Sequence, residues 1–192
     1  MPASAHHFTE PLDVLIVDDE ADARELLAEF CTARGFRIAV AHDGRAALHA
    51  LQRATPPFPI VIADLNLPHA DGFAVLEAAR RAHASCYVVM VTGYATIDGA
   101  VRAVRSGAYD FLAKPFALAQ LELVLDRIRD RMALEAENRQ LARQAVGDRP
   151  RGPEPPSLAD RIRLLEDRVA TLERLVIPGS PSDRRPGVSE NR

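Results

Sequence analysis

The chain of 192 residues lacks the features that would mark a membrane or secreted protein. No apolar run is long enough to cross a lipid bilayer, and residues 1–10 contain no apolar core that could form a signal peptide. Its only two cysteines, Cys31 and Cys86, lie far apart and without the spacing of metal ligands. We therefore expect a cytoplasmic protein with two reduced, buried thiols.

An excess of positive charge is also missing. Lys and Arg together number 24, against 27 Asp and Glu, so the net charge is −3. Nucleic-acid-binding modules usually carry a basic patch, and the composition therefore argues against DNA as a partner. The sequence shows no Gly-rich phosphate loop of an ATPase, and no helix-turn-helix fits between its last two proline-rich stretches.

The sequence does contain a regular alternation of short apolar runs with amphipathic segments. The apolar runs predict strands at residues 12–17, 36–40, 60–64, 87–92 and 110–113. The segments between and after them predict helices at residues 20–34, from 43, 71–82, 95–106 and from 117. Nearly continuous apolar strands that alternate with helices indicate an α/β fold, a doubly wound five-stranded parallel sheet of the flavodoxin-like kind.

Polar side chains stand at the carboxyl ends of four predicted strands. Asp18 and Asp19 follow the first strand, while Asp64 ends the third. Thr92 ends the fourth strand and Lys114 follows the fifth. Ligands of doubly wound sheets bind beyond these ends, so the five side chains should lie together. Three carboxylates repel one another unless a cation such as Mg²⁺ is bound, and a lysine with a hydroxyl suits a phosphoryl group.

These residues and their neighbours resemble the receiver domain of two-component signalling. The segments that carry the resemblance are DLNLPHADG (64–72), VTGYA (91–95) and GAYDFLAKPF (107–116). They are most similar to receivers of the nitrogen-regulation, enhancer-binding subfamily. A dehalogenase-type phosphatase also uses strand-end aspartates, but its Asp-x-Asp pattern is missing after the first strand. A receiver that no longer accepts phosphate would normally lack one of the five key residues, and all are present here.

The resemblance implies a phosphoacceptor rather than an enzyme that acts on another substrate. Asp64 would accept a phosphoryl group from a sensor histidine kinase. Mg²⁺ would be held by Asp19, Asp64 and the backbone carbonyl of Asn66, with Asp18 acting largely through water. The only reactions of the chain itself would be its own phosphorylation and dephosphorylation.

The resemblance also implies phosphoryl-binding and switch residues. Lys114 and Thr92 would contact the phosphoryl oxygens, and Thr92 with Phe111 would pass the change to the fourth helix, fifth strand and fifth helix. Asn66 and Tyr94 stand where receivers tune autodephosphorylation. The peptide bond after Lys114 is expected to be cis, a form that X-Pro bonds tolerate.

Outside the receiver, the sequence divides into five further segments. The receiver itself covers residues 11–131. We expect disordered tails at residues 1–10 and 178–192. Between the receiver and the second tail we expect a helical extension (132–146), a Pro-rich linker (147–157) and a short coiled coil (158–177).

The helical extension continues the apolar spacing of the last receiver helix. The receiver part places Leu118, Leu121, Leu125, Ile128 and Met132 on one face, and Leu134, Asn138 and Leu141 follow after a shift in register. Glu135 and Arg139 are expected to pair four residues apart. The pattern fits a solvated helix and a dimer-forming helix equally well.

The coiled-coil segment has apolar residues at heptad spacing. Its seam consists of Leu158, Ile162, Leu165, Val169, Leu172 and Val176. Branched residues at position a with leucine at position d favour a parallel two-stranded coiled coil, so we expect a homodimer. An amphipathic helix that docks on another protein is the alternative.

The sequence as a whole predicts a two-component response regulator that signals through dimerisation or contacts with a downstream protein. Two alternatives stay open. The first is a transcription regulator with a DNA-binding element that the sequence does not reveal, and the second is a phosphorelay intermediate.

Overall fold

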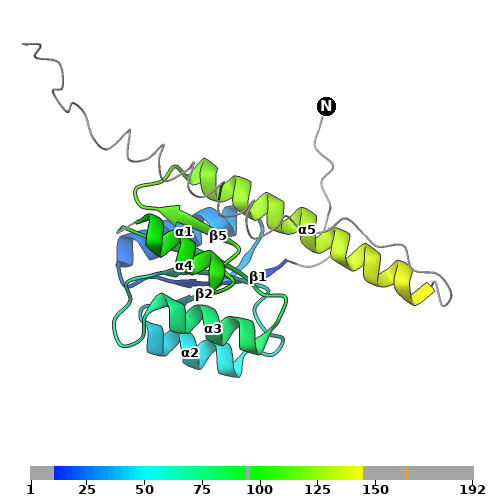
Figure 1. Cartoon of the computed structure of the whole chain (residues 1–192), viewed down its shortest axis with the longest axis horizontal. Coiled ribbons are helices and arrows are strands. Elements are labelled where there is room, and N and C mark those ends of the chain that lie inside the picture. Colours follow the sequence, from blue (N-terminus) through cyan, green and yellow to red (C-terminus); the bar gives the residue numbers. More distant parts are fainter. Residues whose placement is uncertain (1–10, 94–95, 145–162, 164–192) are drawn as a thin grey trace, which may run out of the picture.

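The computed structural model describes residues 11–93, 96–144 and 163. Strands and helices alternate throughout this part of the chain (Figure 1). The strands are β1 (Asp13–Val17), β2 (Arg37–Ala41), β3 (Ile60–Asp64), β4 (Tyr87–Thr92) and β5 (Asp110–Ala113). The helices are α1 (Ala21–Ala33), α2 (Gly44–Arg53), α3 (Gly72–Ala82), α4 (Ile97–Arg105) and α5 (Leu118–Gln144). The predicted elements are confirmed, with ends that shift by one or two residues.

The five strands form one parallel sheet in the order β2-β1-β3-β4-β5. The chain runs outward from β1 to β2, then returns past β1 to β3 and continues in the other direction. This reversal makes the space between the ends of β1 and β3 the switch point, where ligands of such sheets bind. The predicted doubly wound, flavodoxin-like sheet is therefore confirmed.

Helices cover both faces of the sheet, which explains why the strands are apolar throughout. On one face, Leu15 and Val17 pack with residues of α2, α3 and α4. On the other, Val14 and Ile16 pack with residues of α1 and α5. Figure 1 shows α2 and α3 on one side of the sheet and α5 on the other. Alternate residues of each strand thus serve two separate cores.

The core contains both cysteines and one stripe of α1. Cys31 and Cys86 are buried and free, as expected, and burial raises the pKa of their thiols to about 11 and about 12. On α1, Leu26 is 52% exposed although it is apolar. Leu27 and Phe30 fill that side of the core together with Cys31, so the buried stripe of α1 is turned away from Leu26.

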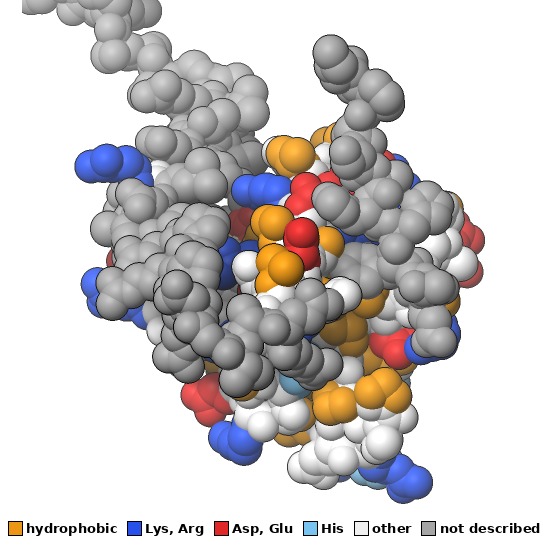
Figure 2. Space-filling model, turned by 90° about the vertical axis from the view of Figure 1, so that its right-hand side faces the viewer, with side chains coloured by type: hydrophobic (Ala, Val, Ile, Leu, Met, Phe, Trp, Pro, Cys, Tyr) orange, Lys and Arg blue, Asp and Glu red, His pale blue; other side chains and the backbone are white. Residues whose placement is uncertain are grey.

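Helix α5 begins in the core and continues past the sheet (Figure 1). Leu121, Leu125 and Ile128 are completely or almost completely buried, whereas Leu134 and Leu141 are more than half exposed. On the face at the far end of α5, hydrophobic side chains lie between acidic and basic ones where grey atoms do not cover them (Figure 2). The helix therefore extends beyond the residues that pack against the receiver sheet.

The predicted pair of Glu135 and Arg139 is wrong. The Oε1 atom of Glu135 accepts from the Nε atom of Arg131 at 3.1 Å, one helical turn toward the N-terminus instead of the C-terminus. Glu135 also lies beside the hydroxyl of Tyr87, at the start of β4. This contact with the sheet favours the partner on the receiver side.

The linker at residues 147–157, the coiled-coil seam, both tails and Tyr94 lie outside the described residues. Within the described part of the chain, no helix combines the length and the apolar character that a bilayer span requires.

Candidate functional site

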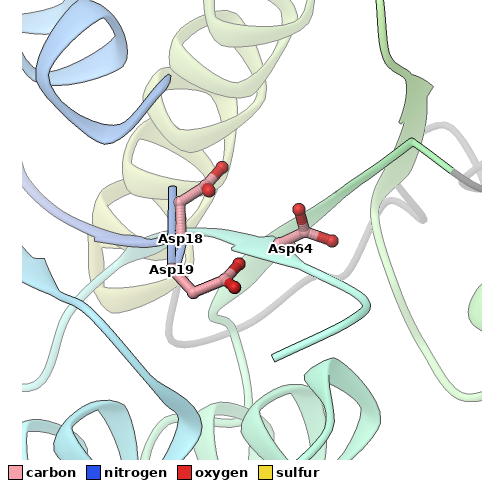
Figure 3. Close-up of side chains that lie close together, drawn as sticks. All are labelled: Asp18, Asp19 and Asp64. Atoms are coloured by element: carbon pink, nitrogen blue, oxygen red, sulfur yellow. The ribbon is translucent and has the colours of Figure 1, made fainter. Parts of the chain in front are cut away.

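Three aspartates from two neighbouring strands meet at the switch point of the sheet (Figure 3). Asp18 and Asp19 follow β1, and Asp64 is the last residue of β3, the strand that pairs with β1. One carboxylate oxygen from each residue lies within 4.8 Å of the other two. Asp18 and Asp64 are buried, whereas Asp19 is exposed. The structure therefore brings together the three carboxylates that the sequence placed at strand ends.

Backbone contacts hold Asp18 in place. Its Oδ1 atom accepts from the backbone N–H of Glu20 at 3.0 Å, which fixes the turn between β1 and α1. Its backbone carbonyl accepts from Nη1 of Arg24 at 2.7 Å. Sequence reasoning did not identify Arg24, because an arginine on the first turns of a helix is ordinary until the fold shows which carbonyl it reaches.

Lys114 joins two of the three carboxylates. Its Nζ atom donates to Oδ2 of Asp18 at 2.7 Å and to Oδ2 of Asp64 at 2.8 Å. Partial burial alone would lower the pKa of this ammonium group, but the hydrogen bonds and charges of Asp18 and Asp64 outweigh burial and raise it. Lys114 is also the only lysine among the 24 basic residues of the chain. The peptide bond that follows it is cis, as predicted.

The loop after β3 approaches Asp64 closely. The backbone N–H of Asn66 donates to Oδ1 of Asp64 at 2.9 Å, so both carboxylate oxygens of Asp64 have donors. A side chain at Gly72 would place its Cβ atom 2.3 Å from the backbone oxygen of Asp64. Only glycine fits at this approach, which lets the loop fold back over the end of β3.

The structure also places the proposed phosphoryl-binding and switch residues near this edge. Thr92 ends β4 and is fully buried, and its Oγ1 atom accepts from Nδ2 of Asn66 at 3.3 Å. The backbone N–H of Lys114 donates to the carbonyl of Thr92 at 2.7 Å, which ties the ends of β4 and β5 together. Phe111 is only 3% exposed and packs in the core beneath α4.

The electrostatics of the site are unbalanced. Three carboxylates, those of Asp18, Asp19 and Asp64, lie together, and the ammonium group of Lys114 contacts only Asp18 and Asp64. Carboxylate and carbonyl oxygens are the ligands that hard divalent cations prefer, and such an ion would balance the excess charge. The donor set and the separation of the carboxylates therefore fit a divalent cation.

Comparisons with known proteins agree with this geometry. Residues 14–126 match the family described as response regulator receiver domain. The chain is 35% identical over 128 residues to the regulatory protein AtoC of Escherichia coli, covering 67% of this chain and 27% of AtoC. It is 30% identical over 163 residues to the nitrogen assimilation regulatory protein NtrX of Azorhizobium caulinodans, covering 85% and 34%. It is 33% identical to the transcriptional regulatory protein ZraR of Klebsiella oxytoca, covering 60% and 26%. The chain thus spans about a quarter to a third of the length of these relatives.

Two solved structures are similar to the chain in fold and sequence. One is the CheX–CheY complex of Borrelia burgdorferi with beryllofluoride and magnesium, 27% identical with a TM-score of 0.59, covering 62% of this chain and 90% of that one. Another is a response regulator of Burkholderia pseudomallei with a phosphorylated aspartic acid and a calcium ion, 27% identical with a TM-score of 0.55, covering 65% and 74%. The predicted resemblance, including that to the nitrogen-regulation subfamily, is confirmed. The chain therefore belongs to the response-regulator receiver family and is part of a two-component system.

Proposed function

We propose that Asp64 accepts a phosphoryl group from a phosphohistidine of a sensor histidine kinase. The observation that carries the proposal is the position of Asp64, the one aspartate of the three that both ends a strand and contacts Lys114. An aspartate of the related B. pseudomallei regulator is phosphorylated, which supports the same chemistry here.

Asp18, Asp19 and Asp64, with the backbone carbonyl of Asn66, would hold the metal, and Asp18 would act largely through water. The indirect role of Asp18 is the one that the resemblance to receivers implies. Mg²⁺, the ion of the related B. burgdorferi complex, would neutralise charge on the oxygens of the transferring group when bound.

In the transfer itself, a carboxylate oxygen of Asp64 forms a bond to phosphorus while the phosphorus–nitrogen bond of the donor breaks. The imidazole of the kinase leaves with the electron pair, and an acyl phosphate remains on Asp64. Lys114 keeps its charge next to the new phosphoryl oxygens, and the Thr92 hydroxyl donates to one of them. Attack by water on phosphorus later releases phosphate, with Asn66 and Tyr94 tuning the rate. The chain would catalyse no reaction of another substrate.

The phosphoryl group would act on a switch formed by Thr92 and Phe111. The Thr92 hydroxyl accepts from Asn66 and could also donate to a phosphoryl oxygen on Asp64, which would draw Thr92 toward Asp64. The buried position of Phe111 is the one that this movement would stabilise, because the aromatic ring then fills the space behind Thr92. The surface of α4, β5 and α5 would shift its population accordingly.

The output would be dimerisation or contact with a downstream protein. In the domain division predicted from the sequence, residues 132–146 would extend the last helix, residues 147–157 would form a linker, and residues 158–177 would form the coiled coil. The continuation of α5 to Gln144 supports the first of these expectations. The residues beyond the receiver would then pair two copies of the chain in a protein of the cytoplasm. The regulatory names of AtoC, NtrX and ZraR favour keeping the second candidate, a transcription regulator. A salt-dependent DNA complex would support that candidate, and rapid transfer to a histidine protein would instead support a relay intermediate.

Phosphoacceptance is tested by intact mass with Mg²⁺ and two small donors, acetyl phosphate and phosphoramidate, whose reactive bonds are P–O and P–N. We expect a mass increase of one phosphoryl group, lost in Asp64→Asn. Asp71→Asn is the matched control, because Asp71 only caps α3 and asparagine caps helices equally well. Normal labelling of Asp64→Asn would refute the assignment.

A second measurement reads the site without covalent chemistry. Because Lys114 is the only lysine, isotope-labelled lysine gives a single side-chain NMR signal from the site. Beryllofluoride with Mg²⁺ should shift that signal, whereas beryllofluoride with chelator should not. Light scattering of the same samples then shows whether the phosphoryl mimic changes the oligomeric state.

A further inference from the structure

Two histidines and an aspartate gather at a second place on the carboxyl edge of the sheet. His42 and Asp43 lie between β2 and α2, and His69 lies in the loop between β3 and α3. The Nε2 atoms of His42 and His69 face the same oxygen, Oδ2 of Asp43, at 3.5 and 3.9 Å. The phosphoacceptor site uses none of the three residues.

Asp43 is held in a fixed orientation. It caps α2, and its Oδ1 atom accepts from the backbone N–H of Ala46 at 2.6 Å. This bond, followed by the charges of the two histidines and Arg45, lowers the pKa of Asp43 despite some opposing desolvation. The carboxylate is therefore ionised near neutral pH, and its second oxygen faces the two imidazoles. Such a carboxylate, oriented by a backbone donor, is the kind of ligand that metal sites use.

The loop that carries His69 is held against α2. The backbone N–H of Gly44 donates to the carbonyl of Pro68 at 3.2 Å, and a Cβ atom at Gly44 would lie only 2.0 Å from the oxygen of Ala70. His69 itself has a φ of 68°, in the left-handed region that residues other than glycine rarely adopt. The contact between the loop and α2 thus holds His69 in a costly conformation beside Asp43.

Two of the three separations within the cluster, those from each imidazole nitrogen to Oδ2 of Asp43, can be compared with a hydrogen bond and with a metal site. Both are too long for a good hydrogen bond between nitrogen and oxygen. Two ligands of a tetrahedral zinc ion, with bond lengths of about 2.0–2.2 Å, lie about 3.3–3.6 Å apart. The separations at Asp43 Oδ2 equal or slightly exceed this value.

We propose that His42, Asp43 and His69 form a site for Zn²⁺, distinct from the acidic magnesium site. Two imidazoles and one carboxylate are a ligand set that zinc accepts, with water in the fourth position. Among the described residues, only the acidic trio already has three ligand atoms within 4.8 Å of one another. The imidazoles therefore turn toward each other on binding, and their exposure of 72% and 55% leaves room for this. The ion then links the start of α2 to the loop that contains Asn66.

The site is tested by calorimetric titration of Zn²⁺ into the full chain in excess Mg²⁺, which occupies the acidic trio. All proteins carry His6→Asn and His7→Asn, because these adjacent histidines could bind zinc themselves. We expect one zinc ion per chain, and affinity that falls at least about tenfold in His42→Ala and in His69→Ala. His49→Ala is the matched control, an exposed histidine on α2 outside the cluster, and should bind as the parent does.

Imidazole ¹⁵N NMR of the parent supplies a readout that does not depend on the variants. Zinc should shift the signals of His42 and His69 together and leave His49 and His83 in place. Absence of zinc binding, binding that survives both substitutions, or shifts confined to other histidines would each overturn the proposal.

Discussion

The two edges of the sheet differ in whether their carboxylates have basic partners. At the amino ends of the strands, acidic groups have basic partners: Asp13 pairs with Arg37, Asp110 with Arg127, and Glu135 with Arg131. At the carboxyl ends, three carboxylates lie together, and one ammonium group, that of Lys114, contacts two of them. The negative charges of the amino edge (the paired edge) are therefore balanced within the protein. Those of the carboxyl edge (the crowded edge) would need a further cation. The surplus of negative charge thus lies at the edge where the metal and the phosphoryl group are proposed to bind.

This difference also separates stability from function. Pairing a carboxylate with an arginine stabilises the fold modestly or not at all, while crowding carboxylates destabilises it. Residues kept at the crowded edge therefore serve binding at a cost in stability. Substitutions at the two edges should accordingly differ in kind as well as in size.

The largest effect should come from removing Lys114, the ammonium group that contacts the carboxylates of Asp18 and Asp64. Lys114→Met leaves Asp18 and Asp64 facing each other without their shared donor. By analogy with loss of a single charge-stabilising donor in other active sites, the rate of labelling by acetyl phosphate should fall about 100-fold or more.

Arg53→Met, a substitution of an exposed arginine at the end of α2, is the control and should label at the parent rate. A Lys114→Met protein that is folded by circular dichroism and labels at a similar rate would show that the acidic residues suffice.

At the paired edge, Arg127→Gln should affect stability and leave labelling almost unchanged. Asp110 is buried and loses the guanidinium that donates to it at 3.0 Å. We expect the free energy of unfolding to fall by about 1–2 kcal/mol, the cost of weakening a hydrogen bond to a buried charged group. Urea unfolding measures this, with exposed Arg139→Gln as the control within about 0.5 kcal/mol of the parent.

Asp19→Asn should change stability in the other direction. Removing one of three crowded carboxylates relieves repulsion on the order of 1 kcal/mol, the Coulomb energy of two charges about 4 Å apart in water. The variant should melt at a higher temperature than the parent in chelator, and should gain less from added Mg²⁺. A lower melting temperature of the variant in chelator would mean that repulsion among the three carboxylates does not destabilise the fold.

The smallest effect should come from Asp13, which bonds Arg37 through Oδ2 and Nη2 at 2.7 Å. The bond with Arg37 lowers the pKa of Asp13. The ion pair therefore stabilises the fold above the unfolded-state pKa of about 3.9, and the contribution disappears as the pH falls through the lower folded-state value. Because the pair is largely exposed, Asp13→Asn should cost a few tenths of a kcal/mol at pH 7 and nothing at pH 2. Parallel urea titrations at both values of pH measure the difference, and an equal cost at both would exclude the ion pair as its cause.

The sequence predicts the arrangement of strands and the five strand-end residues well, for a simple reason. Apolar runs such as residues 60–64 and 87–92 are buried on both faces, so they need no partner-specific information to become inner strands. Once the strands are parallel, their order along the chain places Asp18, Asp64 and Lys114 at one edge.

Choices between equivalent partners could not be predicted. Helical spacing allows Glu135 to pair with Arg131 or Arg139, and the contact with Tyr87 that favours Arg131 comes from β4. Arg24 reaches the carbonyl of Asp18 for similarly tertiary reasons. His42 and His69 carry no spacing signal at all, because two separate loops bring them to Asp43.

Helix α5 is anchored in the core at one end and extends well beyond it at the other. From Ile128, its last fully buried residue, to Gln144 the helix measures about 24 Å at a rise of about 1.5 Å per residue. A tilt of the helix by about 10° about Ile128 would move Gln144 by roughly 4 Å, given that length. A rearrangement of α5 too small to disturb the core would thus be large at Gln144, the last residue of the helix.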